Sequence, residues 1–111
     1  MDTPDALRAY DIWTEGSRLT ITIRKEFDIG NLHQDWAQSI IVQHPGPFQE
    51  VVIDLSHIGI VSSTFFAGVM QLHNCYVPNG SKQLILLKPD NRVLRTLTMM
   101  RLDKLFTIQA R

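Results

Sequence analysis

Residues 51–68 read VVIDLSHIGIVSSTFFAG, and this stretch decides the fold. Its first five residues, Val51–Leu55, are mostly β-branched and apolar, which is the pattern of a strand covered on both faces. After a short loop, the run Ser62-Ser63-Thr64 leads into an apolar segment that continues to about Cys75. Serine is a common helix cap, so this segment is expected to be a buried central helix. A buried strand followed by such a helix is a unit of a parallel α/β sheet.

On the amino-terminal side, residues 19–23 alternate apolar and polar side chains, as a half-buried strand does. Residues 9–13 form a weaker strand candidate, and the turn residues 15–17 between the two indicate a hairpin. Residues 31–43 repeat apolar side chains at helical spacing, with Asn31 as a candidate cap. The prolines and glycine at 45–47 end that helix.

On the carboxyl-terminal side, residues 83–87 read as another buried strand and residues 105–108 as a last short one. Between them Asp90 can cap a third helix, whose expected apolar face consists of Val93, Leu94, Leu97 and Met100. The predicted order is β-β-α-β-α-β-α-β, a mixed, mostly parallel sheet reached through right-handed crossovers, with helices packed against it.

Composition limits the class of protein. The chain has 111 residues, the size of one domain, and 11 Lys and Arg balance 11 Asp and Glu. A nucleic-acid-binding protein normally has a basic excess. The acidic amino terminus lacks a signal-peptide pattern, and no apolar run reaches the ~20 residues that span a membrane. These features predict a cytoplasmic protein with neither a membrane span nor a nucleic-acid ligand.

The hydroxyl run stands where a functional site is expected in such a fold. Ligands and partners of open α/β sheets meet the edge at which strands lead into helices. A helix amino terminus offers free N–H groups and partial positive charge, so it tolerates a phosphate on Ser62, Ser63 or Thr64. The simpler alternative for Ser63 is a helix cap alone. Asp54 and Ser56 are expected to form a turn at the strand end.

Two stretches of the chain resemble a known family. Asp-Leu-Ser at 54–56, followed by Ser62-Ser63 and a helix of small and apolar residues, resembles the signature of STAS domains, the sulphate-transporter and anti-sigma-factor-antagonist domains. Residues 88–97 and 102–108 are similar to the third helix and final strand of that family. The resemblance extends from about residue 11 to residue 108. It implies a single STAS domain over residues 1–111 that lacks the family's C-terminal helix.

The resemblance implies bacterial signal transduction by partner switching. Stand-alone members bind an anti-sigma factor that is also a serine kinase, and thereby release a sigma factor for transcription. Phosphorylation of a serine at the helix start breaks the complex, and a phosphatase restores it. The matched serine is Ser63. The partner surface implied in this way consists of Asp54, Ser56, Ser62, Ser63, Thr64 and Phe65.

An alternative is a STAS subunit or scaffold of a transporter or stress-signalling complex that takes no phosphate. Val61 stands where the family usually has Asp or Asn, and Thr64-Phe65-Phe66 replaces Gly-Leu-Gly. These differences favour the alternative. One of the two consecutive phenylalanines is expected in the core and the other partly exposed as an interface anchor, with burial of both left open.

Other chemistries are not favoured by the sequence. The four histidines, at 33, 44, 57 and 73, lack the spacing of zinc ligands, so we expect no metal and no cofactor. Ser63 with His57 and Asp54 lacks the arrangement of a hydrolase triad, and the chain is therefore expected not to be an enzyme. Cys75, in a mostly apolar helix, is expected to be a buried small residue.

Overall fold

The computed structural model describes residues 10–24, 35–58, 63–77 and 84–109. The chain has an α/β fold with a five-stranded mixed sheet and three helices among these residues, in the order that the sequence predicts. The elements are β1 (Tyr10–Glu15), β2 (Arg18–Ile23), α1 (Trp36–Gln43), β3 (Glu50–Asp54), α2 (Ser63–Tyr76), β4 (Ile85–Leu87), α3 (Asn91–Met99) and β5 (Thr107–Gln109).

The strands lie in the order β1-β2-β3-β4-β5, so β3 is the central strand. β1 pairs antiparallel with β2 through the predicted hairpin, whose turn contains Gly16 at a φ of 60°. All other neighbouring strands are parallel, with Ile53 of β3 opposite Ile21 and Leu86. The carboxyl ends of four strands therefore meet at one edge of the sheet, and the loop that leaves β3 starts from the middle of that edge.

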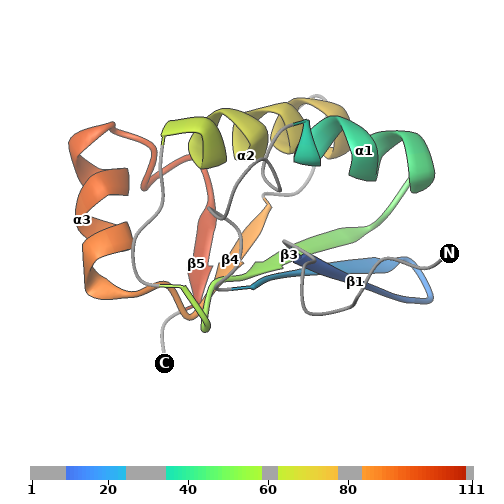
Figure 1. Ribbon diagram of the computed structural model, residues 1–111, viewed down its shortest axis with the longest axis horizontal. Helices are drawn as coiled ribbons and strands as arrows, with labels where there is room; N and C mark the ends of the chain where they lie inside the picture. Colours follow the sequence, from blue (N-terminus) through green and yellow to red (C-terminus); the bar gives the residue numbers. More distant parts are fainter. Residues whose placement is uncertain (1–9, 25–34, 59–62, 78–83, 110–111) are drawn as a thin grey trace, which may run out of the picture.

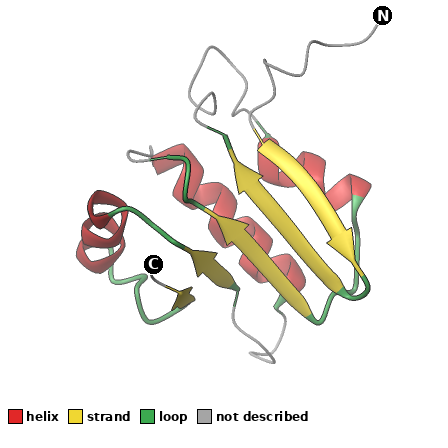
Figure 2. Cartoon of the chain, turned by 90° about the horizontal axis from the view of Figure 1, so that it is seen from below, coloured by secondary structure: helices red, strands yellow, loops and turns green. Residues whose placement is uncertain are grey.

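Two helices, α1 and α2, cover one face of the sheet (Figure 1 and Figure 2). β2 shows why: Leu19, Ile21 and Ile23 alternate with polar residues and are completely buried, so one side of the strand is apolar. α3 lies at the β4–β5 end of the sheet in both views. Its Val93 and Leu97 belong to the same hydrophobic core.

The contact between α1 and α2 centres on an aromatic stack. The rings of Trp36 and Phe65 lie 5.5 Å apart with an angle of 2° between their planes. Gly68, one turn further along α2, lies against the same indole, and a Cβ at this position would overlap it. The small residue lets the two helices approach closely, which holds the first half of α2 in place.

The start of α1 differs from the prediction. The helix begins at Trp36, and the residue at its N-cap position, Asp35, has a left-handed φ of 55° and makes no side-chain capping bond. Asn31, the expected cap, lies outside the described residues. The helix ends at Gln43, just before the prolines, as the sequence predicts.

Two side chains expected in the core are exposed. Cys75 is exposed because it lies just outside the buried stripe of α2 that contains Leu72 and Tyr76. Met100 follows the end of α3 and is 46% exposed, so the apolar face of that helix ends at Leu97.

The last strand starts at Thr107, two residues later than the sequence predicts. A turn occupies the preceding residues, and it is closed by a hydrogen bond from the Leu105 N–H to the Leu102 carbonyl at 3.1 Å.

Candidate functional site

The carboxyl end of the central strand is closed by a turn. Asp54, the last residue of β3, accepts a hydrogen bond from the backbone N–H of Ser56 at 2.9 Å. Both residues are half-buried. The turn predicted for this pair is thus confirmed, with Asp54 supplying its side chain and Ser56 its backbone.

Apolar residues hold this turn against the sheet. Leu55 is completely buried, and its N–H donates to the carbonyl of Leu87 in the next strand at 2.9 Å. Ile58 is 9% exposed and donates its N–H to the Leu55 carbonyl at 3.3 Å. His57, between them, is exposed. The end of β3 therefore presents the polar residues Asp54 and Ser56 on a backbone that the buried side chains of Leu55 and Ile58 hold in place.

The central helix α2 begins at Ser63. Ser62 and the side chains of Ser63 and Thr64 lie outside the described part of the structure, which gives the backbone of the helix start and not these hydroxyls. The first turn of the helix contains no acidic residue. Its partial positive charge is therefore not offset by a carboxylate from its own first turn.

The two phenylalanines that follow are both core residues. Phe65 is 0% and Phe66 2% exposed, and their rings meet edge to face at 5.4 Å. The expectation that one of them is partly exposed is wrong, and the alternative of burial for both is correct. Phe65, expected on the partner surface, has no accessible side chain to offer a partner. Its role is to fix the helix start against α1 and the sheet.

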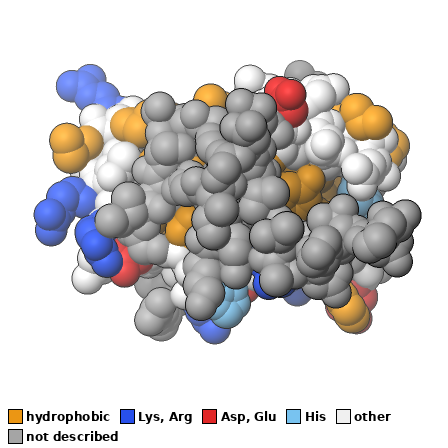
Figure 3. Space-filling view, viewed as in Figure 1, with side chains coloured by type: hydrophobic (Ala, Val, Ile, Leu, Met, Phe, Trp, Pro, Cys, Tyr) orange, Lys and Arg blue, Asp and Glu red, His pale blue; other side chains and the backbone are white. Residues whose placement is uncertain are grey.

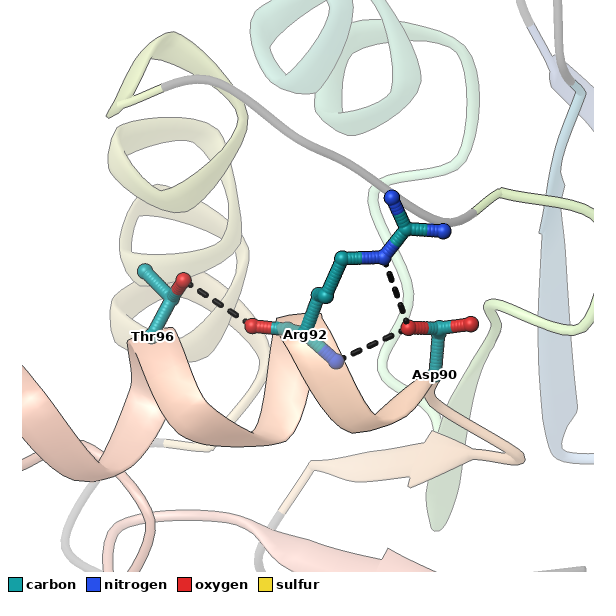
Figure 4. A network of polar contacts seen from close by, with 3 residues as sticks. All are labelled: Asp90, Arg92 and Thr96. Atoms are coloured by element: carbon teal, nitrogen blue, oxygen red, sulfur yellow. Dashed lines mark hydrogen bonds and ion pairs between the residues drawn. The ribbon is translucent and has the colours of Figure 1, made fainter.

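α3 lies at the same end of the molecule as the start of α2 (Figure 1 and Figure 2). Figure 4 shows its polar contacts: Asp90 Oδ1 accepts the backbone N–H of Arg92 at 2.8 Å, which confirms the predicted cap. The Nε of Arg92 lies 3.5 Å from the same oxygen, and Thr96 Oγ1 donates to the Arg92 carbonyl at 3.0 Å.

A shallow polar pocket of about 210 Å³ lies elsewhere. It is lined by Glu15, Ser17, Arg18, Gln49 and Glu50. These residues surround the starts of β2 and β3, where an ion pair joins Arg18 Nε to Glu50 Oε1 at 2.9 Å. The pocket is therefore at the opposite edge of the sheet from Asp54, and it contributes nothing to the candidate site.

Comparisons with known proteins add no family. No protein-family model matches the chain, and a search of curated proteins finds no match. Within the described ranges, no helix is long and apolar enough to cross a membrane, and no group of three or more His, Cys, Asp or Glu could hold a metal ion.

Sequence reasoning missed one surface, the exposed cationic side of α3. The chain total of zero charge conceals it. Residues 84–109 contain five Lys and Arg against two Asp, and the remaining described residues contain two Lys and Arg against five Asp and Glu. Counting charged residues for each segment, rather than for the whole chain, reveals the excess of positive charge around α3.

Proposed function

We propose that this chain is a cytoplasmic regulatory protein of the anti-sigma-factor-antagonist type, built on a STAS domain. It binds an anti-sigma factor that is also a serine kinase, and phosphorylation of Ser63 releases it. A phosphatase reverses the switch. The protein itself catalyses no reaction.

One observation supports this proposal most strongly. The helix start at Ser63, the position matched to the family's phosphoserine, opens the first element after the central strand of a mostly parallel sheet. The Asp54–Ser56 turn and the first turn of α2 lie at the two ends of the connection between β3 and α2, and the proposed partner surface includes both. The element order, in which three helices alternate with the parallel strands after an opening hairpin, is compatible with the proposed domain.

The proposed mechanism is electrostatic. A phosphate adds about two negative charges at the start of α2, where helix N–H groups favour it. The helix need not unfold, because Phe65 and Phe66 remain in the core. The added charge instead weakens the complex, through repulsion by acidic groups of the partner and the cost of desolvating a phosphate in the interface.

A binding measurement tests the proposal. The anti-sigma factor kinase that co-purifies with the chain from its own cells is titrated with wild-type protein, Ser63→Ala and Ser63→Asp. Ser63→Ala should bind like the wild type and Ser63→Asp about tenfold or more weakly. Asn74→Asp, which adds the same charge on an exposed residue near the other end of α2, is the control and should bind normally. Equal binding by Ser63→Asp and wild type contradicts the proposal.

A second candidate is a STAS subunit of a transporter or stress-signalling complex that is never phosphorylated. The burial of both Phe65 and Phe66 favours it, because the residues that replace the family's Gly-Leu-Gly serve packing here. Co-purification with a transporter ATPase or with other STAS proteins, and no phosphate on any hydroxyl in those cells, would support this candidate over the first.

A further inference from the structure

The charged residues are unevenly distributed along the chain, although its net charge is zero. Five cationic side chains lie on α3 and its two flanking segments: Lys88, Arg92, Arg95, Arg101 and Lys104. In the space-filling view, Lys and Arg side chains gather at the α3 end of the molecule, with hydrophobic side chains between them (Figure 3). This end therefore carries both positive charge and exposed apolar surface.

The helix itself explains the combination. Val93 and Leu97 are buried and fix which side of α3 faces the core. Arg92, Arg95 and Met99, at spacings of three and four residues, share the opposite, exposed side. Met99 is 77% exposed, the most exposed of the large apolar side chains among the described residues, and Met100 beside it is 46% exposed.

The arginines are available to a partner. Arg95 and Arg101 form no ion pair in the described part of the structure. Arg92 contacts Asp90 only at 3.5 Å and with 64% of its side chain exposed, a geometry that contributes little. Two terminal nitrogens of Arg92 point away from Asp90 in Figure 4. Planar guanidinium groups are suited to carboxylates, which they bind through two parallel hydrogen bonds.

We propose that the exposed side of α3 together with the two residues that follow the helix, called here the α3 face and made of Arg92, Arg95, Met99, Met100 and Arg101, binds an acidic amphipathic helix of a partner protein. Carboxylates of that helix pair with the arginines, and its apolar side chains pack on the methionines, which adapt their shape to a partner. The face spans the nine residues of α3, about 14 Å at 1.5 Å per residue, and so accommodates two to three turns of the partner.

The same features favour a protein over other polyanions. Phosphate backbones are bound by cationic side chains and neutral hydrogen-bond donors, and two exposed thioethers contribute neither. Insertion into a lipid surface needs a broad apolar face, whereas the apolar face of α3 is already used in the core. This surface does not include Ser63, and the inference stands without the proposed phosphorylation.

The test is a titration of the full chain, labelled with ¹⁵N, with a synthetic helical peptide in which Glu and Leu alternate at helical spacing. Amide shifts should change along α3 and weaken with added salt. A peptide with Lys in place of Glu should cause no change there. Arg95→Glu should weaken binding about fivefold or more, and Met99→Ser should weaken it as well. Arg18→Glu, the same charge change in the exposed Arg18–Glu50 pair at the far edge of the sheet, should not.

Dispersed amide spectra of each variant show that it is folded. No shift change on α3 at millimolar Glu-Leu peptide overturns the proposal, as does equal binding of the Lys-Leu peptide. Vesicles of phosphatidylglycerol and a short DNA duplex are titrated in parallel. If either perturbs the α3 face more strongly than the acidic peptide does, the partner is not an acidic protein helix.

Discussion

Gly68 of α2 packs directly on the indole ring of Trp36 in α1, so closely that a Cβ on Gly68 would overlap the Nε1, Cε2 and Cζ2 atoms of the ring. The helix that carries the proposed switch is thus held against its neighbour by the absence of a side chain. The same indole stacks on Phe65, one turn closer to the helix start. The contact couples the packing of α1 to the position of Ser63.

Gly68→Ala should therefore destabilise the protein. Alanine favours a helix by about 1 kcal/mol over glycine, and on an open helix surface the change would be stabilising. Here the new Cβ would overlap the indole, so the substitution should destabilise the protein instead. We expect a net loss of about 1–3 kcal/mol in the free energy of unfolding. Urea denaturation measures it.

The control for this prediction is Trp36→Phe, whose smaller ring lacks the atoms nearest to Gly68. The Gly68→Ala change should cost clearly less in the Trp36→Phe background than in the wild type, so the double variant should lose less stability than the sum of the two single variants. Equal costs in the two backgrounds would show that the indole is not the obstacle.

Asp90→Ala should lower stability by about 1 kcal/mol, because the backbone N–H of Arg92 loses the carboxylate that caps α3 at 2.8 Å. Asp90→Ser keeps a capping oxygen and should lose only a few tenths of that amount. Thermal unfolding of the two variants distinguishes them. If serine costs as much as alanine, the side-chain bond is not what stabilises the helix start.

Because of Tyr76, the free energy of unfolding should depend on pH in the alkaline range. Its hydroxyl donates to the carbonyl of His44 at 2.6 Å, and burial, with a smaller contribution from Cys75, raises its pKa from 10.0 to about 12. Below pH 10 the folded and unfolded chains both keep the proton. Between pH 10 and about 12 only the folded chain does, so this contribution to stability falls as pH rises.

Tyr76→Phe isolates that effect. At neutral pH the variant should be less stable than the wild type by about 1 kcal/mol, the value of the lost hydrogen bond. The difference should shrink as pH rises above 10, because only the wild type has this proton to lose. Urea denaturation of both proteins at several pH values measures the difference. A constant difference over the whole range would argue against a buried, hydrogen-bonded Tyr76.

The sequence was sufficient for the order of elements and for the local chemistry of their ends. The run of β-branched residues identified β3. Asp54 and Asp90 have short side chains that accept a hydrogen bond from the backbone N–H two residues further on, so their roles depend only on nearby residues. Such interactions are local and can be read from spacing. The position of the candidate site, after the carboxyl end of β3, follows from the same order of elements.

What could not be predicted depends on which way a helix faces. Cys75 and Met100 lie at the margins of apolar stripes, where a small rotation of the helix decides between burial and exposure. The burial of both Phe65 and Phe66 requires that α2 packs on the sheet and on α1 at once. The cationic side of α3 was concealed by acids elsewhere in the chain.

The most direct test of the switch is the mass and site of phosphate on the purified protein. Wild type and Ser63→Ala are incubated with the co-purifying kinase and Mg-ATP, and intact mass and fragment spectra are recorded. We expect one phosphate on wild type, located at Ser63, and none on Ser63→Ala. A wild-type chain that gains no phosphate, or gains it only at another residue, would contradict the assignment of Ser63 at the start of α2 as the switch.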